Sequence, residues 1–235
     1  GGDDDAKFNL ASGPGRQAGS SMKPIGLAAA LQIGIPITRF YDATSPIEIS
    51  NPPVCGPTWR VRGGTDGFRT LADATRWSRN TIYAQLMVDI GPPRFVEMSE
   101  ALGIGEGRIQ PVCAAILGTE NVNMVEMATV YSTFARDGVK VDPIMVTRIV
   151  NGDGTQLYQS VAERETVLNK TVNDQLTWAL STVMNGTGWR ADLEGYADAG
   201  KTGTAQNNAD ATFVGYTRQR TTAVWVGYPD EQIPM

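Results

Sequence analysis

The C-terminal part of the chain constrains its fold most strongly. Three short runs occur there, ADAGKTGTAQ (197–206), ATFVGYT (211–217) and TTAVWVGYP (221–229), each bounded by turn residues. Short runs rich in β-branched and aromatic residues between turns predict successive antiparallel strands. A sheet of this size has to bury one of its faces, so the rest of the chain must supply the cover.

Helix-like periodicity fills most of the chain before these strands. Apolar spacing and helix-end residues predict helices over residues 20–33, 70–77, 80–91, 93–103, 123–138 and 171–186. Residues 35–69 predict a long loop region with short extended pieces, and residues 144–160 predict a hairpin with its turn at NGDG. Together these features predict an α+β fold. We expect a single domain over residues 1–235, with residues 70–137 as a helical subdomain.

The composition excludes several classes of function. The net charge is −5, so the chain lacks the basic footprint of a nucleic-acid-binding protein. No apolar run is long enough to cross a bilayer, and with no histidine present a zinc site is not favoured, so no metal or cofactor is expected. The GGDDD opening has no Met and no leader, which predicts a piece of a longer protein.

The chain has two cysteines, and their state is left open by the sequence. Cys55 and Cys113 lie in PVCGP and PVCAA contexts, without a C-x-x-C pair. They form either one disulfide, in an oxidising compartment, or two unpaired buried thiols.

Three short motifs carry the candidate chemistry. Ser20-Ser21-Met22-Lys23 is S-x-x-K, Ser78-Arg79-Asn80 is S-x-N, and Lys201-Thr202-Gly203 is K-T-G, followed by Thr204. Taken singly, each has a structural explanation, as a helix cap or a solvated strand lysine. Each nevertheless occurs once, in this order, and the motifs contain two of the chain's five lysines. Three ordered coincidences are improbable, so we interpret them as one site.

The first two motifs supply a nucleophile and its base. Ser20 and Lys23 are spaced to share one helix face, whereas Ser21 points elsewhere. The helix dipole and a second cation, Lys201, disfavour a protonated Lys23, which predicts a neutral amine that acts as general base. In this interpretation Ser78 relays a proton to a leaving amine. Asn80 orients Lys23 or a substrate carbonyl.

The K-T-G segment predicts a substrate-binding strand. An edge strand can pair with an extended peptide, and we expect Gly203 to leave space where the substrate approaches. Lys201, Thr202 and Thr204 are expected to hold a substrate carboxylate. The backbone N–H groups of Ser20 and Thr204 are the candidate oxyanion hole.

This motif set resembles that of penicillin-binding proteins and class A β-lactamases. The resemblance to the transpeptidase domain of class A, bifunctional penicillin-binding proteins covers about residues 1–230. It is carried by RQAGSSMKPIGLAAALQIGI, TLADATRWSRNTIYAQLMVDIG, ILGTENVNMVEMATVYSTFARDG and AGKTGTAQNNADATFVGYTRQRTTAVWVGYPD.

The resemblance implies a function outside the cytoplasmic membrane. Ser20 would attack the D-Ala-D-Ala carbonyl of a peptidoglycan stem peptide, an amine of a neighbouring strand would resolve the acyl-enzyme, and β-lactams would acylate the same serine. A membrane anchor and a glycosyltransferase domain are expected in the full-length protein. Against the family pattern, a strand before Gly1-Gly2 and a helix after the last strand are missing here, which predicts an unpaired edge around residues 221–228.

Three rival functions share the motifs. A serine β-lactamase of class A would need a deacylating glutamate, and Glu165-Thr166-Val167-Leu168-Asn169 matches E-x-x-L-N. Its position late in the chain favours instead a surface turn that caps the helix from residue 171, with Asn169 or Thr171 as the cap. A D,D-carboxypeptidase, in which water resolves the acyl-enzyme, and a non-catalytic penicillin-binding sensor remain alternatives.

Overall fold

A three-stranded antiparallel sheet organises the molecule. The computed structural model describes residues 9–50, 55–229 and 231–235. The sheet consists of β11 (Ala199–Thr204), β12 (Asp210–Tyr216) and β13 (Thr221–Gly227), in that order, which confirms the three predicted strands. In the register, Lys201 is opposite Val214 and Gly203 is opposite Thr212. Within the described residues β13 has one strand partner, β12; the segment Gly1–Phe8 lies outside them.

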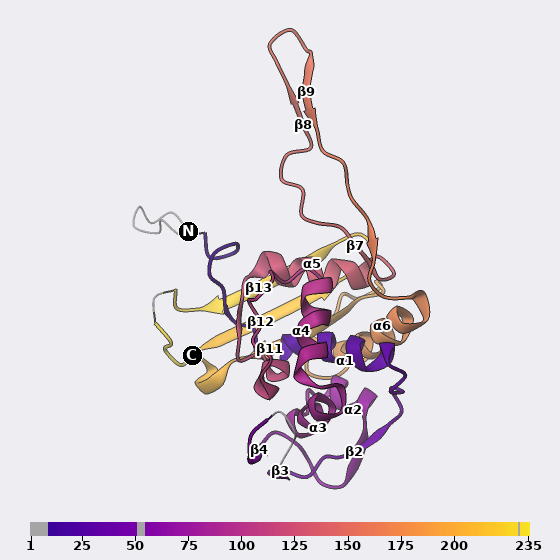
Figure 1. The fold of residues 1–235 in the computed structure, drawn as a ribbon, viewed down its shortest axis with the longest axis vertical. Helices are drawn as coiled ribbons and strands as arrows, with labels where there is room; N and C mark the ends of the chain where they lie inside the picture. Colours follow the sequence, from indigo (N-terminus) through magenta and orange to yellow (C-terminus); the bar gives the residue numbers. More distant parts are fainter. Residues whose placement is uncertain (1–8, 51–54, 230) are drawn as a thin grey trace.

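Helices cover this sheet and form the core with it. Helix α6 (Lys170–Met184) packs on β11, and α5 (Met124–Ala135) packs on β12 and β13 (Figure 1). Helix α1 (Lys23–Gln32) lies against α6 and is buried over most of its length. Because helices and sheet share one apolar core, the predicted α+β class is confirmed.

The remaining helices pack around α1. Helix α2 (Leu71–Arg76) packs on α6, and α3 (Asn80–Ile90) and α4 (Pro92–Ala101) pack on α1. Thr70 caps α2, and Asn123 and Glu126 form a capping box at the start of α5. Asn169 caps α6, as the sequence predicted. The short 3-10 helices are η1 (Gly19–Met22), η2 (Cys113–Leu117), η3 (Trp189–Ala191) and η4 (Gln206–Asn208).

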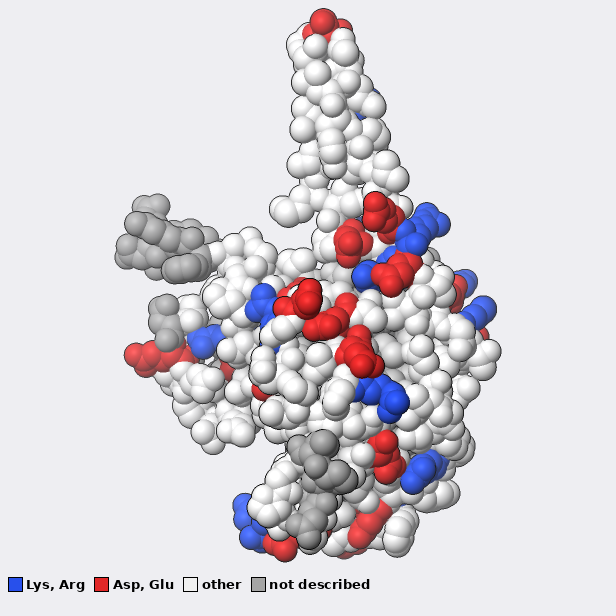
Figure 2. Space-filling model, viewed as in Figure 1, with Lys and Arg blue, Asp and Glu red and all other residues white. Residues whose placement is uncertain are grey.

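Short two-stranded ladders decorate the helical and sheet regions. The pairs are β1 (Arg16–Gln17) with β6 (Asn121–Val122), β2 (Phe40–Asp42) with β5 (Phe68–Thr70), β3 (Ile47–Ser50) with β4 (Thr58–Val61), and β7 (Val139–Lys140) with β10 (Glu165–Thr166). The predicted hairpin is confirmed as β8 (Arg148–Val150) and β9 (Gln156–Gln159), and it projects from the body. Figure 2 shows that this projection is almost uncharged, apart from an acidic tip.

The start of the first helix differs from the prediction. Ser20 lies in the 3-10 helix η1, and the α-helix begins at Lys23. The Lys23 N–H donates to the Ser20 carbonyl, a tight 3-10 bond, and the next residue, Pro24, has no N–H to donate. The proline that is tolerated in the first turn therefore also fixes where the α-helix begins.

Gly203 packs against η1 and does not leave space for a substrate. A Cβ on Gly203 would overlap the Ala18 carbonyl and the Thr212 hydroxyl, and would lie 3.1 Å from Ser21 N. The expectation that its missing side chain makes room for substrate is therefore wrong. Gly203 is needed because β11 runs in direct contact with the backbone of η1.

The two cysteines are joined in a disulfide. Cys55 and Cys113 have Cα atoms 5.4 Å apart, within the usual range, and the bond links the segment before β4 to η2. Within the described residues, no helix is long and apolar enough to span a membrane.

Substituting Gly203→Ala tests the contact between β11 and η1. The added methyl meets backbone atoms that cannot move aside, so the free energy of unfolding should fall by about 1–3 kcal/mol. Chemical denaturation measures this loss. Gly152→Ala is the matched control, because a Cβ at Gly152 meets nothing within 4 Å, and it should leave stability nearly unchanged. Equal effects of the two variants would contradict the packing.

Removing the disulfide should destabilise the protein. The bond closes a loop with a sequence separation of 58 residues. A loop of that length predicts a loss of up to about 4 kcal/mol in the Cys55→Ala/Cys113→Ala variant, because the unfolded chain gains freedom. Thermal unfolding with and without reductant measures the effect. The reductant should lower the Tm of the parent protein and leave that of the variant unchanged; a parent Tm insensitive to reductant would argue against the bond.

Candidate active site

Lys23 is a buried lysine surrounded by oxygen atoms. Its side chain is 0% exposed at the first turn of α1. Its Nζ lies 2.7 Å from the Ser78 carbonyl oxygen, 3.2 Å from Ser78 Oγ and 2.6 Å from Asn80 Oδ1. The S-x-x-K and S-x-N motifs are therefore in direct contact, although Ser78 is far from Lys23 in sequence.

Lys201 reaches the same hydroxyl from the sheet. It is also 0% exposed, and from β11 its Nζ donates to Ser78 Oγ at 2.8 Å and to the Thr202 carbonyl at 3.0 Å. Ser78 Oγ thus lies between two lysine amines. All three sequence motifs meet at this one oxygen atom.

Burial and mutual repulsion weaken the basicity of both lysines. The pKa of Lys23 is lowered well below its ordinary value of 10.5, first by burial and then by the charge of Lys201. Burial lowers the pKa of Lys201 to about 7. A neutral Lys23 amine near pH 7 was expected from the helix dipole and Lys201. The direction of the shift agrees, and burial is its main cause.

The hydrogen bonds fit a neutral Lys23. The Ser78 carbonyl and Asn80 Oδ1 are acceptors only, so they take the two protons of an uncharged amine. The Ser78 hydroxyl can then donate to the lone pair of Lys23 while it accepts a proton from Lys201. This arrangement gives a continuous path from one lysine to the other through Ser78.

Ser20 and Ser21 have different environments. Ser21 is 0% exposed; its hydroxyl donates to the Ala18 carbonyl at 2.8 Å, and Thr212 Oγ1 lies 3.3 Å from it. Ser20 is partly exposed, and its hydroxyl makes no hydrogen bond within the described parts of the chain. Ser20 is thus the accessible serine of the pair, in agreement with the choice made from spacing. Lys23 Nζ points to Ser78 and Asn80 in this structure and does not bond to Ser20.

Several contacts hold η1 in place, and the sequence did not reveal them. The Tyr131 hydroxyl on α5 donates to the Ser21 carbonyl at 2.8 Å, and Thr212 on β12 donates to the Ala18 carbonyl at 2.8 Å. Gly19 has φ +56, and a Cβ there would lie 2.8 Å from Thr204 N. Because of this close approach, the backbone that carries Ser20 is adjacent to Thr204, the other residue of the candidate oxyanion hole.

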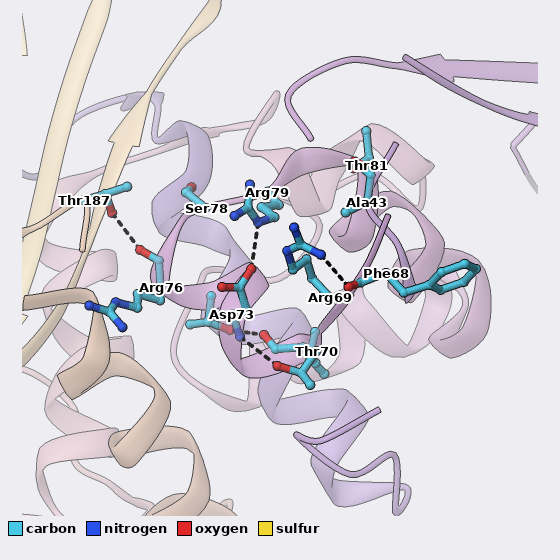
Figure 3. Close-up of polar contacts among 12 residues, drawn as sticks. Ala43, Phe68, Arg69, Thr70, Asp73, Arg76, Ser78, Arg79, Thr81 and Thr187 are labelled. Carbon is cyan, nitrogen blue, oxygen red and sulfur yellow. Dashed lines mark hydrogen bonds and ion pairs between the residues drawn. The ribbon is translucent and has the colours of Figure 1, made fainter. Parts of the chain in front are cut away.

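The turn that carries Ser78 has an unusual backbone. Ser78 has φ +58, in the left-handed region, which costs energy for a residue other than glycine. An ion pair between Arg79 and Asp73, at 2.8 Å, braces the turn against α2 (Figure 3). This geometry points both the carbonyl and the hydroxyl of Ser78 at Lys23.

Thr187 connects the K-T-G strand to this turn. Thr202 Oγ1 donates to Thr187 Oγ1 at 3.1 Å, and Thr187 N donates to the Arg76 carbonyl at 3.3 Å. Figure 3 shows Thr187 beside Arg76 at the end of α2. The glycine-rich stretch NGTG before the strand was the available signal for Thr187, which was not among the residues chosen from the sequence.

Glu165 has a structural partner. It lies in β10, and its carboxylate pairs with Lys140 of β7 at 2.9 Å. The side chain of Glu165 is 62% exposed. These contacts support its interpretation as part of a surface turn. No group of His, Cys, Asp and Glu residues suited to a metal ion occurs in the described ranges.

Comparison with known proteins places the chain in a family. Residues 5–232 match the model of the penicillin binding protein transpeptidase domain. Penicillin-binding protein 1A of Aquifex aeolicus is 31% identical over 95% of this chain and 31% of its own length. The chain therefore spans about a third of the length of the curated relatives that it matches.

Solved structures agree with the sequence comparison. The penicillin-binding protein PonA1 of Mycobacterium tuberculosis is similar over 100% of this chain and 65% of that structure, with 28% identity and a TM-score of 0.87. A second structure of PonA1, in complex with penicillin V, covers 97% of this chain and 64% of its own, with 28% identity and a TM-score of 0.84. With the motifs, the fold and the family model in agreement, the chain belongs to the family of penicillin-binding protein transpeptidase domains.

Proposed function

We propose that this chain is an acyl-serine D,D-transpeptidase that cross-links peptidoglycan stem peptides. The observation that carries the proposal is the pair of fully buried lysines, Lys23 and Lys201, on the Ser78 hydroxyl. An amine held neutral by burial can take a proton from a serine, a role that histidine has in many hydrolases. The chain has no histidine to compete for that role.

Acylation begins with proton transfer from Ser20 to Lys23. The Ser20 O–H bond breaks, the proton joins the Lys23 lone pair, and Ser20 Oγ bonds to the carbonyl carbon of the penultimate D-Ala of the donor. The carbonyl oxygen becomes an oxyanion that the N–H groups of Ser20 and Thr204 can stabilise. Asn80 Oδ1 and the Ser78 carbonyl hold the new ammonium in place.

Expulsion of D-Ala requires a second proton transfer. As the C–N bond breaks, Ser78 donates its hydroxyl proton to the leaving amine and is reprotonated by Lys23. In the second half-reaction the amine of a neighbouring stem peptide attacks the ester and its proton leaves along the same path. The bond from carbon to Ser20 Oγ then breaks, and Ser20 regains a proton.

The K-T-G strand is proposed to bind the donor peptide. The edge of β11 opposite β12 has no strand partner among the described residues, so an extended peptide can add there. Lys201, Thr202 and Thr204 would hold the terminal carboxylate. Gly203 contributes backbone, because the place of its Cβ is occupied by η1.

β-Lactams are proposed to acylate Ser20 as well. PonA1, similar to this chain over 97% of its length, has been solved in complex with penicillin V. A D,D-carboxypeptidase would share the whole acylation step and differ only in using water. A β-lactamase would need a base for that water, and Glu165 is engaged with Lys140 at the surface. A non-catalytic sensor would be acylated without turning over a D-Ala-D-Ala peptide.

The wider context is part of the same proposal. We propose that residues 1–235 act as one transpeptidase domain, with residues 70–137 as a helical subdomain. The relatives named penicillin-binding protein 1A are about three times longer than the matched region. By similarity, the complete protein would carry a glycosyltransferase domain and a membrane anchor, with this domain on the extracytoplasmic side.

Benzylpenicillin should form a covalent adduct on Ser20. Intact-protein and peptide mass spectrometry after treatment measures the site and the rate. Ser20→Ala should abolish the adduct because the nucleophile is gone. Lys23→Ala should slow acylation by about 100-fold or more, because the general base is lost.

Matched controls separate chemistry from folding. Ser21→Ala removes the neighbouring, buried hydroxyl and should keep the adduct. Lys170→Ala removes an exposed lysine that pairs with Asp174, and should leave the acylation rate unchanged. An adduct on any residue other than Ser20 would overturn the assignment.

Acylation should slow above about pH 7. If the Lys201 ammonium holds the carboxylate of benzylpenicillin, the second-order rate constant should fall as Lys201 loses its proton, at a pKa of about 7 in the free enzyme. Lys201→Arg keeps a cation at high pH, so the decline should move to well above pH 9, at a lower absolute rate. A decline at the same pH in both proteins would show that another group controls it.

A further inference from the structure

A buried aromatic ring faces Lys23, and the mechanism above gives it no role. Tyr83 lies on α3, one helical turn after Asn80, and is 0% exposed. Lys23 Nζ is 5.2 Å from the centroid of its ring. That distance lies within the range in which an ammonium is attracted to the face of an aromatic ring. Asn80 and Tyr83 therefore present two groups to Lys23 from the same side of α3.

The hydroxyl of Tyr83 is occupied elsewhere. It lies 2.8 Å from Thr75 Oγ1, and Thr75 donates its own proton to the Leu71 carbonyl at 2.9 Å. Tyr83 must therefore be the donor to Thr75, which ties the far end of the ring to α2. Burial also raises the pKa of Tyr83, so the phenol stays neutral. The ring face is the part of Tyr83 that can act on Lys23.

The other groups around Lys23 give its charged form little support. From β11 comes the cation Lys201, from the α2–α3 turn come the oxygens of Ser78, and from α3 come Asn80 and Tyr83. Within the described residues, no carboxylate forms an ion pair with Lys23. The ammonium thus depends on dipoles and on the negative face of one ring.

We propose that Tyr83 is a positioning residue whose ring face stabilises the ammonium that Lys23 becomes when it takes the Ser20 proton. The inference rests on the function proposed above. A base must accept a proton as well as be free of one, and burial and Lys201 both oppose the ammonium. The ring opposes those two effects without supplying a carboxylate, which would keep Lys23 protonated at rest.

The test alters the electrostatics of the ring and keeps its shape. Three proteins are compared: Tyr83→Phe, a variant with pentafluorophenylalanine at position 83, and the parent. Fluorination reverses the charge distribution of the ring with little change in size. The readout is NMR titration of ¹³C-labelled lysine, which is tractable because the chain has five lysines. Loss of one signal in Lys23→Met assigns Lys23.

The expected result is a pKa shift that follows the ring and not the hydroxyl. Tyr83→Phe should leave the pKa of Lys23 within about 0.3 pH units of the parent, because the ring face remains. The fluorinated ring should lower it by about one further pH unit. The same fluorinated residue at Phe95, which is equally buried on α4, is the matched control and should cause no shift. Equal pKa values in the Phe and fluorinated variants would overturn the proposal.

Acylation by benzylpenicillin gives a second readout. The acid limb of the pH profile should move to lower pH in the fluorinated variant, together with a lower plateau rate, because Lys23 is then a weaker base. A uniform loss of rate without a shift of the limb would indicate a merely structural role. If the parent is not acylated at all, the proposed function fails, while the NMR titration still decides whether the ring acts on Lys23.

Discussion

Two lysine amines share one serine hydroxyl, and the rest of the structure serves to keep them together. Lys23 comes from α1, Lys201 from β11, and Ser78 from the turn between α2 and α3. Burying two like charges is unfavourable in a medium of low polarity, so at least one amine gives up its proton. The fold thereby converts a residue that is normally cationic into a base.

Close packing of backbone maintains this arrangement. Gly19 and Gly203 allow η1 and β11 to touch without side chains between them, and Gly118 does the same on the other side of Gly19. Hydrogen bonds from Tyr131 and Thr212 then fix η1 to the helical layer and to the sheet. The accessible Ser20 is consequently carried on a rigid turn, which suits a nucleophile that must meet a substrate in one geometry.

Local sequence patterns predicted the elements well, because periodicity and turn residues act over short distances. The strands β11 to β13, the hairpin β8–β9 and helices α2 to α6 all follow from such patterns, and the motif order identified Ser20, Lys23, Ser78, Asn80 and Lys201. The sequence did not predict what depends on contacts between distant segments. The positive φ of Ser78, its brace by Arg79 and Asp73, the bridge through Thr187 and the pairing of Cys55 with Cys113 are of this kind. Gly203 was placed correctly but for the wrong reason, since a strand pattern does not show which neighbour lies over a missing side chain.

A structure of the protein after reaction with benzylpenicillin would test the central claim most directly. We expect an ester on Ser20 Oγ, with its carbonyl oxygen within hydrogen-bond distance of the N–H groups of Ser20 and Thr204. Ser78 Oγ should remain between Lys23 Nζ and Lys201 Nζ, at the distances of 3.2 and 2.8 Å found in the free protein. An ester on another residue, or a Ser78 hydroxyl displaced from both amines, would contradict this account.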